Sequence, residues 1–160
     1  MDQFFQSIYS WFCNSSQTVF KIMQNIVNDD GDLLLSSMFP TIGITTAIIT
    51  LLVAFAFYIW PINHPRFKAW WAWLIMLFIN AAINFGLGFA FINHRIKDIH
   101  NEKTGDAIEI FTEYETLSLP VAQWMDFSLA DLCVSIMFFI IASLILNWFS
   151  TNCRFSPFRN

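Results

Sequence analysis

The sequence predicts an all-α integral membrane protein with three transmembrane helices, an amphipathic N-terminal helix and a small β-hairpin-like loop between the second and third spans. Hydrophobic residues make up 56% of the 160 residues and charged residues only 12%, against roughly 25% charged in ordinary soluble domains. Asp, Glu, Lys and Arg are absent from residues 33–65, 69–93 and 132–153. A water-soluble fold of this length has too little polar surface to cover three such stretches.

The three charge-free stretches each contain enough residues to cross a bilayer. A spanning helix needs about 20 apolar residues at about 1.5 Å per residue. We therefore expect transmembrane helices at residues 39–60, 69–92 and 127–149, followed by a tail at 150–160, all in one membrane domain. Asp2 stands where a cleavable signal peptide would have a basic start, so we expect the first span to act as its own targeting signal.

The N-terminal segment, residues 4–28, has apolar side chains spaced three and four apart with Gln, Ser and Asn between them. This spacing is typical of an amphipathic helix. The helix either lies flat in the membrane interface, which its composition favours, or forms a fourth span. The acidic run at residues 29–32 predicts a turn. The apolar positions are Phe5, Ile8, Phe12, Val19, Met23 and Ile26.

The loop between the second and third spans, residues 93–126, differs in kind from the rest of the chain. Residues 108–110 and 112–116 alternate with period two and are rich in β-formers, and residues 101–106 have turn chemistry. We expect a hairpin within residues 95–118. At the end of this loop, Asp126 or Ser128 is expected to cap the third span.

The distribution of basic residues predicts the orientation. With three spans, the short connector after the first span and the C-terminal tail share one side, and neither contains an acidic residue. The positive-inside rule places that side in the cytoplasm and the N-terminus and long loop outside. The lack of organelle signals favours a bacterial inner membrane. The basic residues on the cytoplasmic side are Arg66, Lys68, Arg154 and Arg159, and the tryptophans expected near that interface are Trp60, Trp70, Trp71, Trp73 and Trp148.

Two neighbouring stripes on the second span consist of small or polar residues. Asn80, Asn84 and Gly88 recur every four residues. A second stripe with the same spacing is formed by Ala82, Gly86 and Ala90. Small residues let helix backbones approach closely in lipid, and an Asn facing lipid would leave polar atoms unpaired. We expect this surface to pack against protein or to line water.

The first and third spans carry polar lines as well. Thr46 and Thr50 lie four residues apart in the first span, and a carboxylate begins a similar line in the third. Asp131 is either a helix-start charge, stabilised by the helix dipole, or part of a carboxylate ring at a pore mouth. Together with the second-span stripe, these residues are candidates for pore lining or helix packing. The line in the third span is Asp131, Ser135, Ser143 and Asn147.

The sequence contains no motif for catalysis, a cofactor or a metal. Cys13, Cys133 and Cys153 are odd in number and widely spaced, which predicts three unpaired thiols. A net charge of −4 and a pI near 5.1 argue against nucleic-acid binding. An intramembrane enzyme would need a second catalytic group at the depth of Asp131, and the spans supply no His, Lys or second Asp. We therefore do not expect an enzyme.

These patterns lead to two functional hypotheses. The first is a homo-oligomeric pore or ion channel-like protein in which several copies turn their polar stripes inward. It would prefer cations because all twelve acidic residues lie outside or at the outer edge, and it could serve as a membrane-permeabilising effector. The alternative is a non-conducting accessory or scaffold subunit. In that case the stripes pack against a larger membrane complex, and the long loop docks a partner protein or a ligand.

Overall fold

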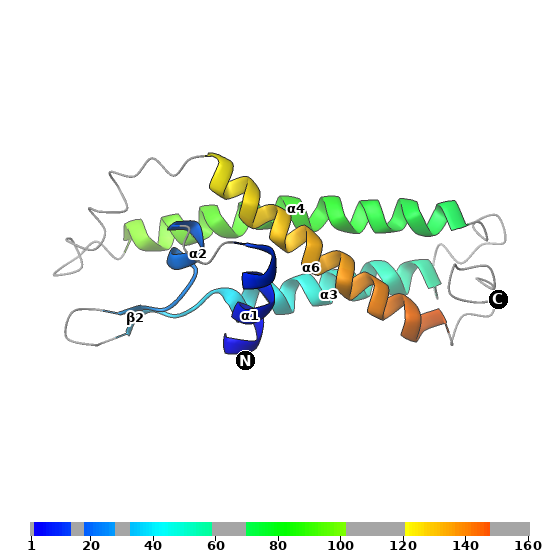
Figure 1. Ribbon diagram of the computed structural model, residues 1–160, viewed down its shortest axis with the longest axis horizontal. Coiled ribbons are helices and arrows are strands. Elements are labelled where there is room, and N and C mark those ends of the chain that lie inside the picture. The colour runs from blue at the N-terminus through cyan, green and yellow to red at the C-terminus, as the bar shows by residue number, and fades with distance from the viewer. Residues whose placement is uncertain (1, 14–17, 28–32, 59–69, 102–120, 148–160) are drawn as a thin grey trace. The chain divides into compact units, whose positions relative to one another are not determined.

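The computed structural model describes residues 2–13, 18–27, 33–58, 70–101 and 121–147. In chain order these residues form helices α1 (Asp2–Phe12) and α2 (Thr18–Ile22), strands β1 (Ile26–Val27) and β2 (Leu33–Leu35), and helices α3 (Phe39–Tyr58), α4 (Trp70–Asn101) and α6 (Val121–Asn147). Figure 1 shows these elements along the chain.

Three of the helices, α3, α4 and α6, are long and apolar enough to cross a membrane. This confirms the three helices expected from the charge-free stretches and fits an integral membrane protein. Helix α3, with 20 residues, has a length of about 30 Å, which matches the hydrocarbon thickness of a bilayer. Helix α4, with 32 residues, is longer than a bilayer requires.

Helix α4 continues to Asn101 rather than ending at Ile92, so the first part of the expected hairpin is wrong. Residues 95–101 are helical because Ile92, Arg95 and Ile99 are spaced three and four apart and all three are buried on one face. Residues 102–120, with the rest of the expected hairpin, lie outside the described residues.

Helix α6 begins at Val121, earlier than the expected start at Phe127. Pro120 directly precedes it, and proline is favoured at the start of a helix because its fixed φ suits the first turn. The expectation that Asp126 or Ser128 caps this helix is therefore wrong, because both residues lie inside it. Asp131 also lies well beyond the first turn, so the helix-start interpretation of its charge loses its basis.

The N-terminal segment forms two helices and a strand, not one helix over residues 4–28. Helix α1 ends at Phe12, and the chain leaves helical geometry after Ile22. β1 then pairs antiparallel with β2, with Ile26 opposite Leu35. The expected turn at residues 29–32 lies outside the described residues. A side chain from α4 explains the end of α2, because Arg95 bonds the backbone carbonyls of Ile22 and Gln24.

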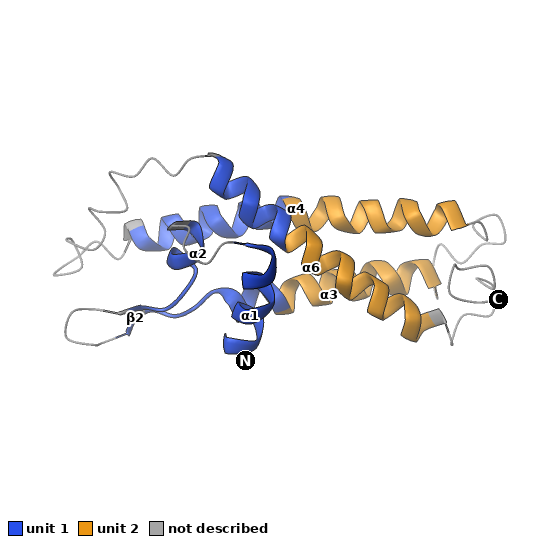
Figure 2. Cartoon of the chain, viewed as in Figure 1, with its two compact units in different colours: residues 1–43, 86–130 blue, residues 44–85, 131–160 orange. Residues whose placement is uncertain are grey.

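The chain divides into two compact units, coloured in Figure 2. Unit 1 comprises Met1–Gly43 and Gly86–Ala130, and unit 2 comprises Ile44–Phe85 and Asp131–Asn160. The centre of unit 1 is aromatic: the Tyr9 ring is stacked on Phe127 at a centroid distance of 5.7 Å, and Phe39 lies 4.9 Å from Phe20. All four rings are buried.

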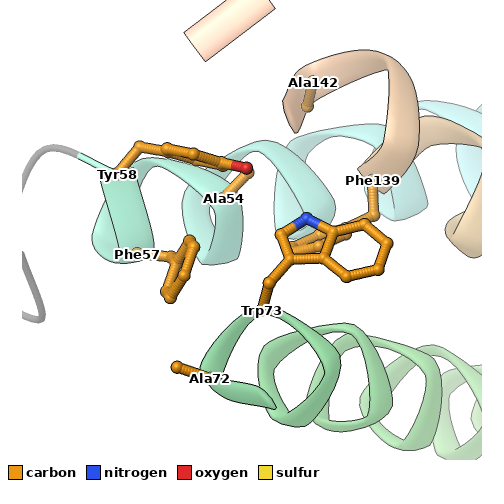
Figure 3. Packing of buried hydrophobic residues seen from close by; sticks show 7 residues of the cluster. All are labelled: Ala54, Phe57, Tyr58, Ala72, Trp73, Phe139 and Ala142. Atoms are coloured by element: carbon orange, nitrogen blue, oxygen red, sulfur yellow. The ribbon is translucent and has the colours of Figure 1, made fainter. Parts of the chain in front are cut away.

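The apolar core of unit 2 is built from all three of its helices (Figure 3). Trp73 of α4 lies against Phe139 of α6 with a centroid distance of 5.9 Å, and Tyr58 of α3 is fully buried in the same cluster. Small side chains at Ala54 and Ala142 leave room for the large rings.

Candidate functional site in the membrane-spanning helices

The polar side chains predicted from the stripes gather inside unit 2. Helix α3 supplies two threonines, α4 two asparagines, and α6 a carboxylate and two serines. Each of these side chains is at most 1% exposed in a single copy of the chain. They are Thr46, Thr50, Asn80, Asn84, Asp131, Ser135 and Ser143.

The carboxylate of α6 is hydrogen-bonded to α3. The Thr46 hydroxyl donates to Asp131 Oδ1 at 2.8 Å, and both residues are fully buried. A carboxylate within a spanning segment is costly unless its oxygens are bonded. The Thr46 hydroxyl offsets part of that cost and ties α3 to α6.

The two asparagines of α4 connect this helix to α6 and to each other. Asn80 Nδ2 donates to the backbone carbonyl of Ser135 at 3.3 Å. Asn84 Nδ2 donates back to the Asn80 carbonyl at 2.9 Å and to Asn80 Oδ1 at 3.2 Å. The Ser135 hydroxyl donates to the Leu132 carbonyl of its own helix at 2.7 Å, as serines in apolar helices commonly do.

A second hydrogen bond between α4 and α6 joins an indole to a hydroxyl. Trp73 Nε1 donates to Ser143 Oγ at 3.2 Å, and both side chains are buried. Trp73 was expected at the aqueous interface with its N–H in water. The structure instead places its N–H on a partner inside unit 2, whereas the neighbouring Trp70 and Trp71 are exposed.

Two buried polar atoms of this network have no hydrogen-bond partner within the described part of the chain. They are Thr50 Oγ1 and Asn84 Oδ1. An unpaired buried polar atom costs about 1–3 kcal/mol. Most polar side chains inside unit 2 are therefore hydrogen-bonded, and one or two further hydrogen bonds could form there.

The small-residue positions of α4 divide between two environments. A Cβ added at Gly88 would lie 2.8 Å from Ser128 Cα and from Ser128 Oγ, so α4 and α6 approach closely there within unit 1. A Cβ at Gly86 would meet no atom within 4 Å. Ala82 and Ala90 are exposed as well, so this second stripe faces outward in the single copy. Asn147 ends α6, and its side chain lies outside the described residues.

Sequence reasoning missed a buried and hydrogen-bonded residue of unit 1, Arg95. Its side chain is buried, and it donates from Nε to the Ile22 carbonyl at 2.6 Å and from Nη2 to the Gln24 carbonyl at 2.7 Å. Helical spacing with Ile92 and Ile99 was the available signal. Without it, Arg95 was assigned to an exposed strand.

Near the other end of unit 1, burial raises the pKa of the Cys13 thiol to about 11, with a smaller contribution from the negative charge of Asp126. A buried thiol that holds its proton so firmly is a poor nucleophile and a poor metal ligand at neutral pH. In the described parts of the chain, no group of three or more His, Cys, Asp or Glu side chains is arranged to hold a metal ion.

The described structure therefore has three helices that are long and apolar enough to cross a membrane, and hydrogen-bonded polar side chains are buried between them in unit 2. Comparison of the chain with known protein families, curated proteins and solved structures gives no match.

Proposed function

We propose that the protein is a non-conducting membrane protein of the accessory or scaffold class. One observation carries the proposal: the polar side chains that would line a pore between copies are buried within one copy, where Thr46, Asn80 and Trp73 donate hydrogen bonds to α6. A polar stripe needs shielding by neighbouring copies only when its own chain leaves it open to lipid.

The outward surface of unit 2 supports the same proposal. Large apolar side chains project from each of its three helices, including Leu52, Phe78 and Ile145. Such side chains are suited to acyl chains, because lipid is as apolar as they are. They offer nothing to coordinate a passing ion.

We propose that partner recognition depends on the segment between α4 and α6. Residues 102–120 contain five acidic residues and one basic residue, Lys103. Opposite charge steers association, so a partner with a basic surface is the complement. We place this segment and the N-terminus outside and the C-terminus in the cytoplasm, in a bacterial inner membrane. This orientation follows the positive-inside rule, because the connector after the first span and the C-terminal tail contain Arg66, Lys68, Arg154 and Arg159 and no acidic residue.

A homo-oligomeric pore is the second candidate, and a specific observation favours it. Thr50 Oγ1 and Asn84 Oδ1 are buried without a hydrogen-bond partner in the described structure. Water in a conducting path would satisfy both atoms. Such a pore would prefer cations, because the acidic residues would concentrate cations at the outer side. It could also serve to permeabilise the membrane.

Ion flux in reconstituted vesicles separates the two proposals. Purified protein in liposomes with a K⁺ gradient is expected to leak no faster than empty liposomes, with or without an applied potential. The Asn84→Leu variant tests the pore directly, because it removes a polar atom from the proposed path. A flux that is present in the wild type and lost in Asn84→Leu would overturn the non-conducting proposal in favour of the pore.

A further inference from the structure

Helix α1 has one buried face and one exposed face. Phe5, Ile8 and Tyr9 are buried against the rest of unit 1. On the other side Phe4 is 62% exposed and Trp11, seven residues later, is 71% exposed. Side chains seven apart lie on one face of a helix. Exposed apolar side chains that gather on one face mark surfaces that contact a membrane or another protein.

The hydroxyl groups on the open side of α1 bond to the helix itself. Ser7 Oγ donates to the Gln3 carbonyl at 2.7 Å, and Ser10 Oγ donates to the Ser7 carbonyl at 2.7 Å. Serines satisfy themselves in this way in helices that face an apolar medium. The only charged residue of α1 is Asp2, at its first position. The face that carries Phe4 and Trp11 therefore demands few hydrogen bonds from its surroundings.

The contacts of α1 within unit 1 fix its depth. Helix α3 has only 20 residues, the number that a bilayer requires, so its first turn lies at the edge of the hydrocarbon region. Helix α1 packs against the first two turns of α3. Tyr9 lies against Phe39 at a centroid distance of 5.7 Å, and the Phe5 ring occupies the space beside Gly43. Any side chain at Gly43 would collide with this ring.

We propose that α1 is embedded in the outer part of one membrane leaflet, with Phe4 and Trp11 in contact with lipid acyl chains. Its 11 residues extend about 16 Å, roughly half of the hydrocarbon thickness, so α1 by itself is too short to be a fourth span. The indole of Trp11 suits this depth because its ring prefers lipid and its N–H prefers water or headgroups.

Spin-label accessibility in nanodiscs of phosphatidylcholine and phosphatidylglycerol tests this placement. A nitroxide is attached at Phe4→Cys or Trp11→Cys in a chain whose native cysteines are changed to alanine. Collision with oxygen, which concentrates in lipid, is compared with collision with a water-soluble nickel chelate. Phe78→Cys on α4, 69% exposed in the wild type, is the lipid reference, and His94→Cys, with a side chain 68% exposed, is the aqueous reference.

The proposal expects labels at positions 4 and 11 to behave like the label at 78, with oxygen collisions exceeding nickel collisions. Values like those at 94 would overturn it by placing this face in water. Low accessibility to both reagents would also overturn it, because a second copy or a partner protein would then cover α1.

A second measurement avoids the cysteine substitutions. Brominated acyl chains quench tryptophan on contact, and the wild type is compared with Trp11→Phe, which keeps an aromatic ring. Because the chain has seven tryptophans, the measured quantity is the fluorescence intensity per molecule that the brominated lipid removes. The proposal expects this lost intensity to be smaller in Trp11→Phe than in the wild type, and an equal loss in both would contradict it. This result does not depend on whether the protein conducts ions.

Discussion

Each of the two units of the chain is stabilised internally by a different kind of interaction. In unit 2, side chains on one spanning helix bond to side chains or carbonyls of another, as in the Thr46–Asp131 and Asn80–Ser135 pairs. In unit 1, aromatic rings surround Tyr9, and one buried arginine bonds backbone carbonyls that a helix end leaves open. In a regular helix the backbone groups are already bonded to one another, so only polar side chains need outside partners, whereas an irregular segment also needs partners for its backbone groups.

Removal of the Arg95 side chain is expected to have the largest effect on stability. We expect this effect to be confined to unit 1. Arg95→Met keeps the length of the side chain but leaves the Ile22 and Gln24 carbonyls without these donors. A hydrogen bond from a charged group is worth about 1.5–3 kcal/mol, so we expect a loss on the order of 3 kcal/mol. Hydrogen exchange of residues 18–27, followed by mass spectrometry, should accelerate strongly.

The control for Arg95 is Lys97→Met, which removes a charge from an exposed position on the same helix. It is expected to leave exchange at residues 18–27 unchanged. Equal acceleration in both variants would show that charge near the end of α4, and not the two carbonyl bonds, orders the N-terminal segment.

The two glycines of α4 in unit 1 provide the next comparison. Gly88→Ala places a methyl group 2.8 Å from Ser128 and is expected to cost about 1–3 kcal/mol through overpacking. Gly86→Ala meets open space and should be neutral or stabilise the helix by up to about 1 kcal/mol. Thermal unfolding in detergent measures both. A lower midpoint for Gly86→Ala than for Gly88→Ala would contradict the close approach of α4 and α6 at Ser128.

In unit 2, the bond between Thr46 and Asp131 is expected to contribute a smaller amount. Interhelical hydrogen bonds in membranes average about 0.6 kcal/mol and reach about 1.7 kcal/mol. A double-mutant cycle of Thr46→Val and Asp131→Ala, each of which removes one partner of the bond, should give a coupling energy in this range, measured by unfolding in mixed micelles. Pairing Thr41→Val, an exposed threonine of α3, with Asp131→Ala should give a coupling near zero.

Titration of the Cys13 thiol is expected to have no effect on stability at neutral pH, where the thiol is protonated in both states, and a definite effect at high pH. Its pKa in the folded protein, about 11, lies above the ordinary value of 9.0, so the folded state holds the proton more tightly. The corresponding stability is complete below pH 9 and is lost as the pH rises from 9 to 11. The unfolding midpoint should fall over this range, and less so in Cys13→Ala. Alkylation of Cys13 in the folded protein should be slow at pH 8.

The sequence was sufficient to predict the polar interior of unit 2. A line of Asn80 and Asn84 has to be buried somewhere, because amide groups in lipid require partners, and the i, i+4 spacing identifies the face. Small residues carry no such requirement. The stripe at Ala82, Gly86 and Ala90 was therefore indistinguishable by spacing from the buried one, and the structure leaves it exposed.

The N-terminal segment could not be predicted in the same way. Its apolar spacing suits one helix, yet Arg95, more than 70 residues away, bonds the carbonyls at the end of α2. When a distant side chain bonds the carbonyls at a helix end, the sequence around that end contains no signal for it. The start of α6 was also predicted too late. The most apolar stretch begins at Phe127, whereas the helix begins at Val121, directly after Pro120.

Most polar side chains of the spans are hydrogen-bonded within one copy of the chain, so the protein needs no second copy of itself to shield them from lipid. The stoichiometry of the protein, extracted directly into native nanodiscs and measured by mass photometry, tests it most directly. We expect one copy per disc, alone or with a different partner protein. A closed ring of four or more identical copies would contradict the claim and make the pore the better account.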